Sequence, residues 1–133
     1  MSKLEEIKEW IRFAEMDRDT VHILYDNYKK PYEIICYHCQ QAVEKYLKSC
    51  LIMYDLPIIK THDLTQLNEL CASKNSKFEK LKEECKKLSF YAIQVRYPFH
   101  KNDLTLEEVE DAIKETENVC EVIIDILEEY LSK

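Results

Sequence analysis

The chain contains no glycine at any of its 133 positions. Glycine adopts the positive φ angles of tight hairpin turns and bulges more easily than any other residue, so a sheet-rich fold of this length is improbable. Phosphate-binding loops and dinucleotide-binding turns also need glycine, because the backbone must approach the phosphates closely. The composition therefore favours an all-α fold and excludes both kinds of glycine-rich nucleotide site.

Capping patterns and apolar periodicity predict where the helices lie. A serine or threonine followed three residues later by glutamate is typical of a helix start, and this pattern occurs at Ser2 and Glu5, Ser76 and Glu79, and Thr105 and Glu108. Apolar residues at a helical period extend these starts and add two further helices. The predicted helices cover residues 3–28, 31–54, 63–72, 77–95 and 106–131. Pro98 requires the fourth of them to stop near Tyr97.

Four long helices with short connections predict an antiparallel up-down four-helix bundle, to which the short helix is added. We expect a single domain over residues 1–133. No apolar run approaches the ~20 residues of a membrane span, and the first residues do not form a signal peptide. The six cysteines are expected to be free thiols of a reducing cytoplasm, with four of them on apolar helix faces: Cys39, Cys50, Cys85 and Cys120.

The net charge of −7 argues against bulk electrostatic capture of nucleic acid, and we expect no DNA partner. It leaves room for a local basic site. The cationic side chains that could converge on one are Lys45, Lys48, Lys60, His62, Arg96, His100 and Lys101.

The helix over residues 31–54 is predicted to have two faces of different chemistry. Its apolar face carries Ile35, Cys39, Ala42, Tyr46, Cys50 and Met53. Its neighbouring polar face carries His38, Gln41, Lys45 and Lys48. This second set could hold a phosphate or nucleotide, with the lysines supplying charge and Gln41 reading a base or ribose.

A structural interpretation of the same residues is an internal polar network. In that interpretation His38 bonds to the start of the helix at residues 63–72. Lys45 pairs with Glu44 or Asp63, and Lys48 is solvated.

Three segments together resemble one known family. Residues 38–48 read H-x-Q-Q-x-x-E-K-x-x-K, residues 61–64 read T-H-D-L, and residues 96–98 read R-Y-P. In this order they resemble the HEPN family, the higher eukaryotes and prokaryotes nucleotide-binding domains. The resemblance implies a helical fold, a dimer and, in HEPN ribonucleases, metal-independent RNA cleavage. There an arginine at a helix end stabilises the charged phosphorane and a nearby histidine moves protons.

The positions that match this catalytic pair are Arg96 and His100, but the chain departs from the family pattern. Only three residues separate the two, where the motif has four to six, and one of the three is Pro98. Asn102 stands where some toxins offer a tyrosine. Alternatively, Arg96 is a helix-end cation paired with a carboxylate such as Asp17 or Glu44, and His100 is an ordinary loop histidine.

Other motifs allow both a structural and a functional interpretation. His62 either reaches the site or serves the capping turn, where Thr61 or Asp63 caps the short helix. Tyr97 could stack a base, although aromatics at helical spacing are more often core or interface. Cys36 and Cys39 form a C-x-x-C pair that we interpret as structural, so we expect no metal site and no cofactor.

Arg18 interrupts the apolar pattern of the first helix. It is expected to form either a buried salt bridge or a contact in a dimer interface.

The resemblance leads to three hypotheses about function. The first is a stand-alone HEPN protein that partners a separately encoded minimal nucleotidyltransferase in a toxin–antitoxin-like module, binding nucleotide or RNA as a homodimer. It uses His38, Gln41, Lys45, Lys48, His62 and Tyr97. The second is a metal-independent endoribonuclease with Arg96 and His100 at a dimer interface. The third is a helical dimer without chemistry of its own, and whether the chain is an enzyme stays open.

Overall fold

The computed structural model describes the backbone of residues 1–96 and 103–133, together with their side chains except those of residues 93–96. Its helices are α1 (Lys3–Asn27), α2 (Tyr32–Met53), α3 (Leu64–Ala72), the 3₁₀ helix η1 (Ser76–Leu81), α4 (Lys82–Arg96) and α5 (Leu106–Leu131). The described residues contain no β-strand. The expectation of an all-α fold is confirmed, and the predicted bounds of α2, α3 and α5 lie within a residue or two of those in the structure.

Side-chain caps define most of the helix starts. The Ser2 hydroxyl accepts a hydrogen bond from the Glu5 amide, and Asp63 caps α3 by accepting from the amides of Thr65 and Gln66. Thr105 and Glu108 form the predicted capping box at the start of α5.

The prediction of a capping box at Ser76 was wrong. The cap is Asn75, whose side chain accepts a hydrogen bond from the Lys77 amide at 3.0 Å. Asn and Ser are about equally good caps, so adjacent candidates cannot be separated by sequence alone. The segment that follows forms the 3₁₀ helix η1, and α4 begins only at Lys82.

Two helices end in a backbone conformation that glycine usually adopts, but the residues in that conformation are not glycine. Lys29 and Asp55 adopt positive φ angles of 52° and 58°, just after α1 and α2 respectively. A left-handed residue after a helix lets the backbone turn and is usually glycine. Among the described residues this conformation therefore occurs at two non-glycine positions, at a cost of roughly 1 kcal/mol each.

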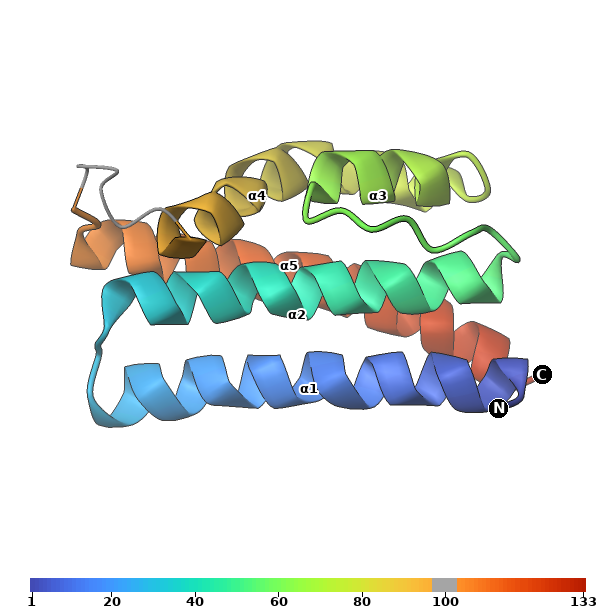
Figure 1. Cartoon of the computed structure of the whole chain (residues 1–133), viewed down its shortest axis with the longest axis horizontal. Helices are drawn as coiled ribbons and strands as arrows, with labels where there is room; N and C mark the ends of the chain where they lie inside the picture. The colour runs from blue at the N-terminus through green and yellow to red at the C-terminus, as the bar shows by residue number, and fades with distance from the viewer. Residues whose placement is uncertain (97–102) are drawn as a thin grey trace.

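Helix α2 is the central element of the fold. It packs against α1, α3, α4 and α5. Figure 1 shows α1 and α2 running in opposite directions, α5 behind them, α3 and α4 along the other side of α2, and both termini at one end of the molecule. Because neighbours surround it, α2 buries 16 of its 22 residues, including polar ones. Half of the predicted polar face of α2 is therefore internal, because Gln41 and Lys48 are buried.

The core is built from apolar side chains of every helix. Its largest fully buried members include Tyr46, Phe78, Leu47 and Ile123. All six cysteines are free and buried, the four on predicted apolar faces among them. Within the described part of the chain, none of the helices is long and apolar enough to cross a membrane.

Candidate functional site

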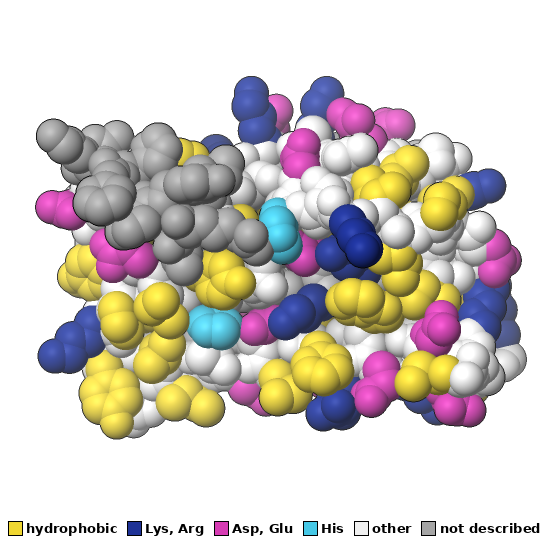
Figure 2. All heavy atoms as spheres, viewed as in Figure 1, with side chains coloured by type: hydrophobic (Ala, Val, Ile, Leu, Met, Phe, Trp, Pro, Cys, Tyr) yellow, Lys and Arg dark blue, Asp and Glu magenta, His cyan; other side chains and the backbone are white. Residues whose placement is uncertain are grey.

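The facing sides of α1 and α2 bring aromatic, acidic and cationic side chains together. On α1, Trp10, Phe13 and Asp17 follow one another at helical spacing and face α2, which runs antiparallel to α1. The Lys48 ammonium lies 5.6 Å from the centre of the Trp10 ring, and the Lys45 ammonium lies 5.9 Å from that of Phe13. Figure 2 shows histidine and cationic side chains grouped on this face beside hydrophobic ones.

Asp17 holds the first of two clusters on this face. Its carboxylate lies 2.8 Å from Nδ1 of His38 and 2.5 Å from Nζ of Lys45. The Asp17 side chain is 10% exposed, whereas those of His38 and Lys45 are 26% and 23% exposed. The acid is thus the inner member of the cluster, and it presents a histidine and a lysine towards the surface.

The partners expected in the internal-network interpretation were wrong for these residues. His38 bonds to Asp17 and not to the start of α3, and Lys45 pairs with Asp17 rather than with Glu44 or Asp63. The reason is the register of α1 on α2, which places Asp17 between the two.

Glu44 holds the second cluster, which lies deeper. Its carboxylate lies 2.8 Å from Nδ1 of His62 and accepts a hydrogen bond from Nζ of Lys48 at 3.0 Å. Gln40 donates to Glu44 at 3.1 Å and to the His62 carbonyl at 2.9 Å, so it ties α2 to the segment before α3. Gln41 donates to the Gln40 side chain at 2.7 Å.

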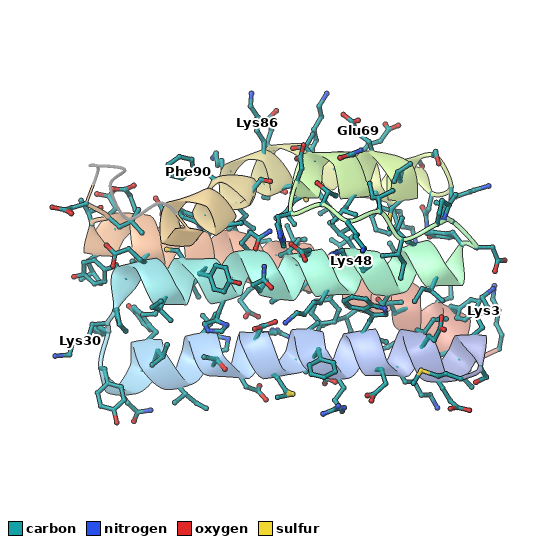
Figure 3. All side chains as sticks on the ribbon, viewed as in Figure 1. Lys3, Lys30, Lys48, Glu69, Lys86 and Phe90 are labelled. Atoms are coloured by element: carbon teal, nitrogen blue, oxygen red, sulfur yellow. The ribbon has the colours of Figure 1, made fainter. Side chains whose placement is uncertain are left out.

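Lys48 is not solvated, so that expectation was wrong. Residue Lys48 is only 8% exposed, because its side chain is enclosed with Glu44 and Trp10. Figure 3 labels it on the face of α2 that is turned to the viewer.

Glu44 is charged in spite of its burial. Burial raises the pKa of this carboxyl, but the hydrogen bonds from His62, Lys48 and Gln40 favour the anion and together bring its pKa below the ordinary value. A buried carboxylate that stays ionised supplies the counter-charge without which Lys48 would be a buried, uncompensated cation.

The two clusters share a chemical arrangement. In each, a carboxylate contacts Nδ1 of a histidine, which fixes the ring and favours the tautomer with the proton on that nitrogen. In each, a lysine ammonium contacts the same carboxylate. Such an oriented imidazole can accept or donate a hydrogen bond at Nε2, and the neighbouring lysine can supply charge to a phosphate.

A third carboxylate-centred cluster joins α1 to α5. Nε of Arg18 lies 3.0 Å from the Glu117 carboxylate, a second guanidinium nitrogen bonds to the same group, and Nε2 of His22 lies 2.8 Å from it. The hydrogen bonds from Arg18 lower the pKa of Glu117, burial raises it, and the contact with His22 lowers it again, so that the pKa lies below its ordinary value. Arg18 therefore forms the partly buried salt bridge that was one of its two expected roles.

The structure separates the residues predicted from sequence into an outer and an inner set. His38, Lys45 and His62 are accessible, and the His62 side chain is 46% exposed. Gln41 and Lys48 are each only 8% exposed and support the Glu44 cluster.

Arg96 is the last residue of α4, as expected from the proline that follows, but its side chain lies outside the described residues. Tyr97 and His100 also lie outside them. Their roles stay predictions.

The C-x-x-C pair lies inside α2 with both thiols buried. Burial raises the pKa of Cys39 to about 12 and raises that of Cys36 as well. Thiols of such high pKa are poor nucleophiles and poor metal ligands at neutral pH. Among the described residues, no group of three or more His, Cys, Asp or Glu side chains could hold a metal ion.

Sequence reasoning missed the contribution of Phe13 and the anchoring role of Asp17. Phe13 is 42% exposed and lines a surface hollow of about 440 Å³ together with Trp10, Lys45 and Ile58. The available signal was the spacing of Trp10, Phe13 and Asp17, which places an acid and two aromatics on one face of α1.

Comparison with known proteins agrees with this helical architecture. The HEPN domain family model matches residues 7–128, which is nearly the whole chain. The chain belongs to the HEPN family. No curated protein and no solved structure matches it. The predicted resemblance is confirmed, and HEPN membership supports a nucleotide- or RNA-related helical domain.

Proposed function

We propose that this HEPN protein is the nucleotide- or RNA-binding helical partner of a separately encoded minimal nucleotidyltransferase, in a toxin–antitoxin-like module. In this proposal α1, α2, α4 and α5 form an antiparallel up-down bundle to which α3 is added, and the chain acts as a homodimer. It works in a reducing cytoplasm, which six free, buried thiols support.

The observation that carries the proposal is the pair of carboxylate-anchored clusters on the face of α1 and α2. Asp17 orients His38 and Lys45, and Glu44 orients His62. The buried carboxylates hold the accessible side chains of His38, Lys45 and His62 in fixed positions, so these side chains are already ordered before a ligand binds. Fixed donors bind anions more tightly than mobile ones, because less conformational entropy is lost on binding.

The proposal gives the nucleotide a definite orientation on this face. Its phosphate meets Lys45 and the outer nitrogen of His38. Its base lies against the hollow lined by Phe13 and Trp10, where an aromatic face supports stacking. Gln41 and Lys48 support the site from the interior by bonding to Glu44. The proposal keeps Arg96, Tyr97 and His100 as further site residues predicted from the sequence.

Binding of fluorescein-labelled single-stranded RNA and of a labelled adenine nucleotide, followed by fluorescence anisotropy, tests the proposal. We expect the double variant His38→Ala, Lys45→Met to lose about tenfold or more in affinity, since it removes two side chains that would donate hydrogen bonds to the phosphate of the ligand. Lys114→Met removes an exposed lysine on α5 as a matched control and should bind like wild type. Wild-type protein that binds neither probe, or a double variant that binds like wild type, would overturn the proposal.

The second candidate is the metal-independent endoribonuclease with Arg96 and His100. The end of α4 at Arg96 favours it, because this is the helix-end position that the catalytic arginine of the family occupies. Light scattering tests the homodimer that both candidates need, and a monomer at micromolar concentration would count against them.

A further inference from the structure

Charge is distributed very unevenly over the helices. Helix α5 carries ten acidic residues and one basic residue, and α1 carries seven acidic and four basic ones. Their net charges are therefore −9 and −3, whereas the whole chain has −7, so the remaining residues together carry +5. Both acidic helices pack against α2, and the ion pair between Arg18 and Glu117 joins them to each other.

A surface groove of about 410 Å³ lies between these two helices. Its lining is mainly apolar, and the apolar side chains are Ile11, Tyr46, Ile124, Leu127 and Leu131. Glu15 of α1 and Glu128 of α5 also line it, and both are exposed.

A cationic side chain with a partner within the protein lies near each end of the groove. At one end Arg18 lines it while bonded to Glu117, so the guanidinium charge is already compensated. Towards the other end the Lys3 ammonium lies 5.7 Å from the centre of the Tyr130 ring, next to Leu131. The lining residues span positions 11–18 and 124–131, which is roughly 10 Å along each helix. The groove has room for one or two large apolar side chains, but not for a whole helix.

We infer that this groove is a docking site for a basic, amphipathic segment of a partner protein. One or two large apolar side chains of the segment insert between α1 and α5, and lysines or arginines on either side meet Glu15, Glu128 and the exposed acids of α5. An apolar anchor in a pocket with opposite charges around it is the usual arrangement of a specific protein contact. Because α1 and α5 carry most of the negative charge of the chain, they attract a basic partner and repel an acidic one.

The inference does not rest on the proposed nucleotide function. The groove shares no residue with the Asp17 and Glu44 clusters. The neighbouring α2 residues Lys45 and Tyr46 belong to different surfaces, because Lys45 is part of the Asp17 cluster and Tyr46 lines the groove. Either surface can fail its test while the other passes.

Two synthetic helical peptides test the inference by fluorescence anisotropy. Both carry leucine at positions i and i+4, and the positions around them are lysine in one peptide and glutamate in the other. The full-length wild-type protein should bind the lysine peptide, with an affinity that falls as salt is added, and should not bind the glutamate peptide. Ile124→Lys places a cation in the groove and should weaken binding about tenfold or more.

Two further variants keep the test decisive. Ile23→Lys makes the same change at an isoleucine of α1 that is 57% exposed and does not line the groove, and it should bind like wild type. Glu128→Lys reverses a charge at the groove and should weaken binding even if Ile124→Lys does not fold, with circular dichroism reporting the helix content of each variant.

Equal binding of both peptides, no binding of the lysine peptide, or unchanged binding by folded Ile124→Lys and Glu128→Lys would each overturn the inference. A wild-type dimer that Ile124→Lys converts to a monomer would also overturn it, since the groove would then belong to a second copy of the chain.

Discussion

Replacing Glu44 by glutamine is expected to destabilise the fold by about 3 kcal/mol. Glu44 is buried and holds Lys48, which is 8% exposed and pairs with it at 3.0 Å. Removing one partner of a buried ion pair costs roughly 3 to 5 kcal/mol, because the other charge is left uncompensated. Glutamine keeps one oxygen acceptor for His62 or Gln40, so we take the lower end of that range.

The expected change is large relative to the stability of the domain. A chain of 133 residues is stabilised by about 7 to 20 kcal/mol in total. With an unfolding entropy of roughly 2.1 cal/mol/K per residue, a loss of 3 kcal/mol lowers the Tm by about 10 °C. Urea unfolding followed by circular dichroism, together with a thermal melt, measures both quantities.

The pH dependence of the same variant has a definite sign. The pKa of Glu44 is lower in the folded protein than its ordinary value, so the stability it contributes is present above about pH 4.3, the value for an unfolded chain. That contribution is lost as the pH falls through the lower pKa of the folded state. The stability difference between wild type and Glu44→Gln should therefore be full at pH 7 and shrink below about pH 4.

A second substitution separates charge from packing. Adding Lys48→Met to Glu44→Gln removes the uncompensated cation while keeping an apolar chain of similar length, and should recover about 2 kcal/mol. Glu9→Gln, at an exposed pair with Arg12 whose side chains are 44% and 56% exposed, is the matched control and should change little. A cost below about 1 kcal/mol for Glu44→Gln, or no recovery in the double variant, would refute the reasoning.

Two further predictions concern the thiols and the end of α4. A thiol reagent should label few of the six buried cysteines in native protein at neutral pH, because burial raises the pKa of Cys39, Cys85 and Cys120 to about 12. In denaturant it should label all six. Immediate labelling of all six in native protein would contradict the structure. If the chain is a ribonuclease, Arg96→Ala should abolish RNA cleavage in the presence of a chelator without changing the circular dichroism. Loss of cleavage in His100→Ala as well would support that histidine as the proton carrier, whereas unchanged cleavage would assign the role to another group such as His38 or His62.

Local signals in the sequence predict the helices well. Caps at Ser2, Asp63 and Thr105 and the apolar period of α2 depend on residues a few positions apart, so they can be identified without knowing the fold. The start of α4 was predicted too early, because Asn75 and Ser76 are adjacent cap candidates and only tertiary packing decides between a 3₁₀ turn and an α-helix there.

The partners within the candidate site could not be predicted in the same way. The sequence places His38, Lys45 and Lys48 on one face of α2, and the structure agrees. It does not specify that Asp17, 28 positions before Lys45, comes to lie beside that lysine, because the register of α1 on α2 is set by packing along the whole interface. Nor does it reveal that Lys48 is enclosed, since this follows from the number of helices that surround α2.

The central claim is that the outer face of the Asp17 and Glu44 clusters binds nucleotide or RNA. Titration of ¹⁵N-labelled protein with a short single-stranded RNA, followed by NMR of the backbone amides and the histidine side-chain nitrogens, tests it most directly. The account predicts the largest shifts at His38, Lys45 and His62, and small ones along α5. Shifts confined to α5 or to the groove between α1 and α5, with the side chains of His38 and His62 unaffected at saturating RNA, would contradict it.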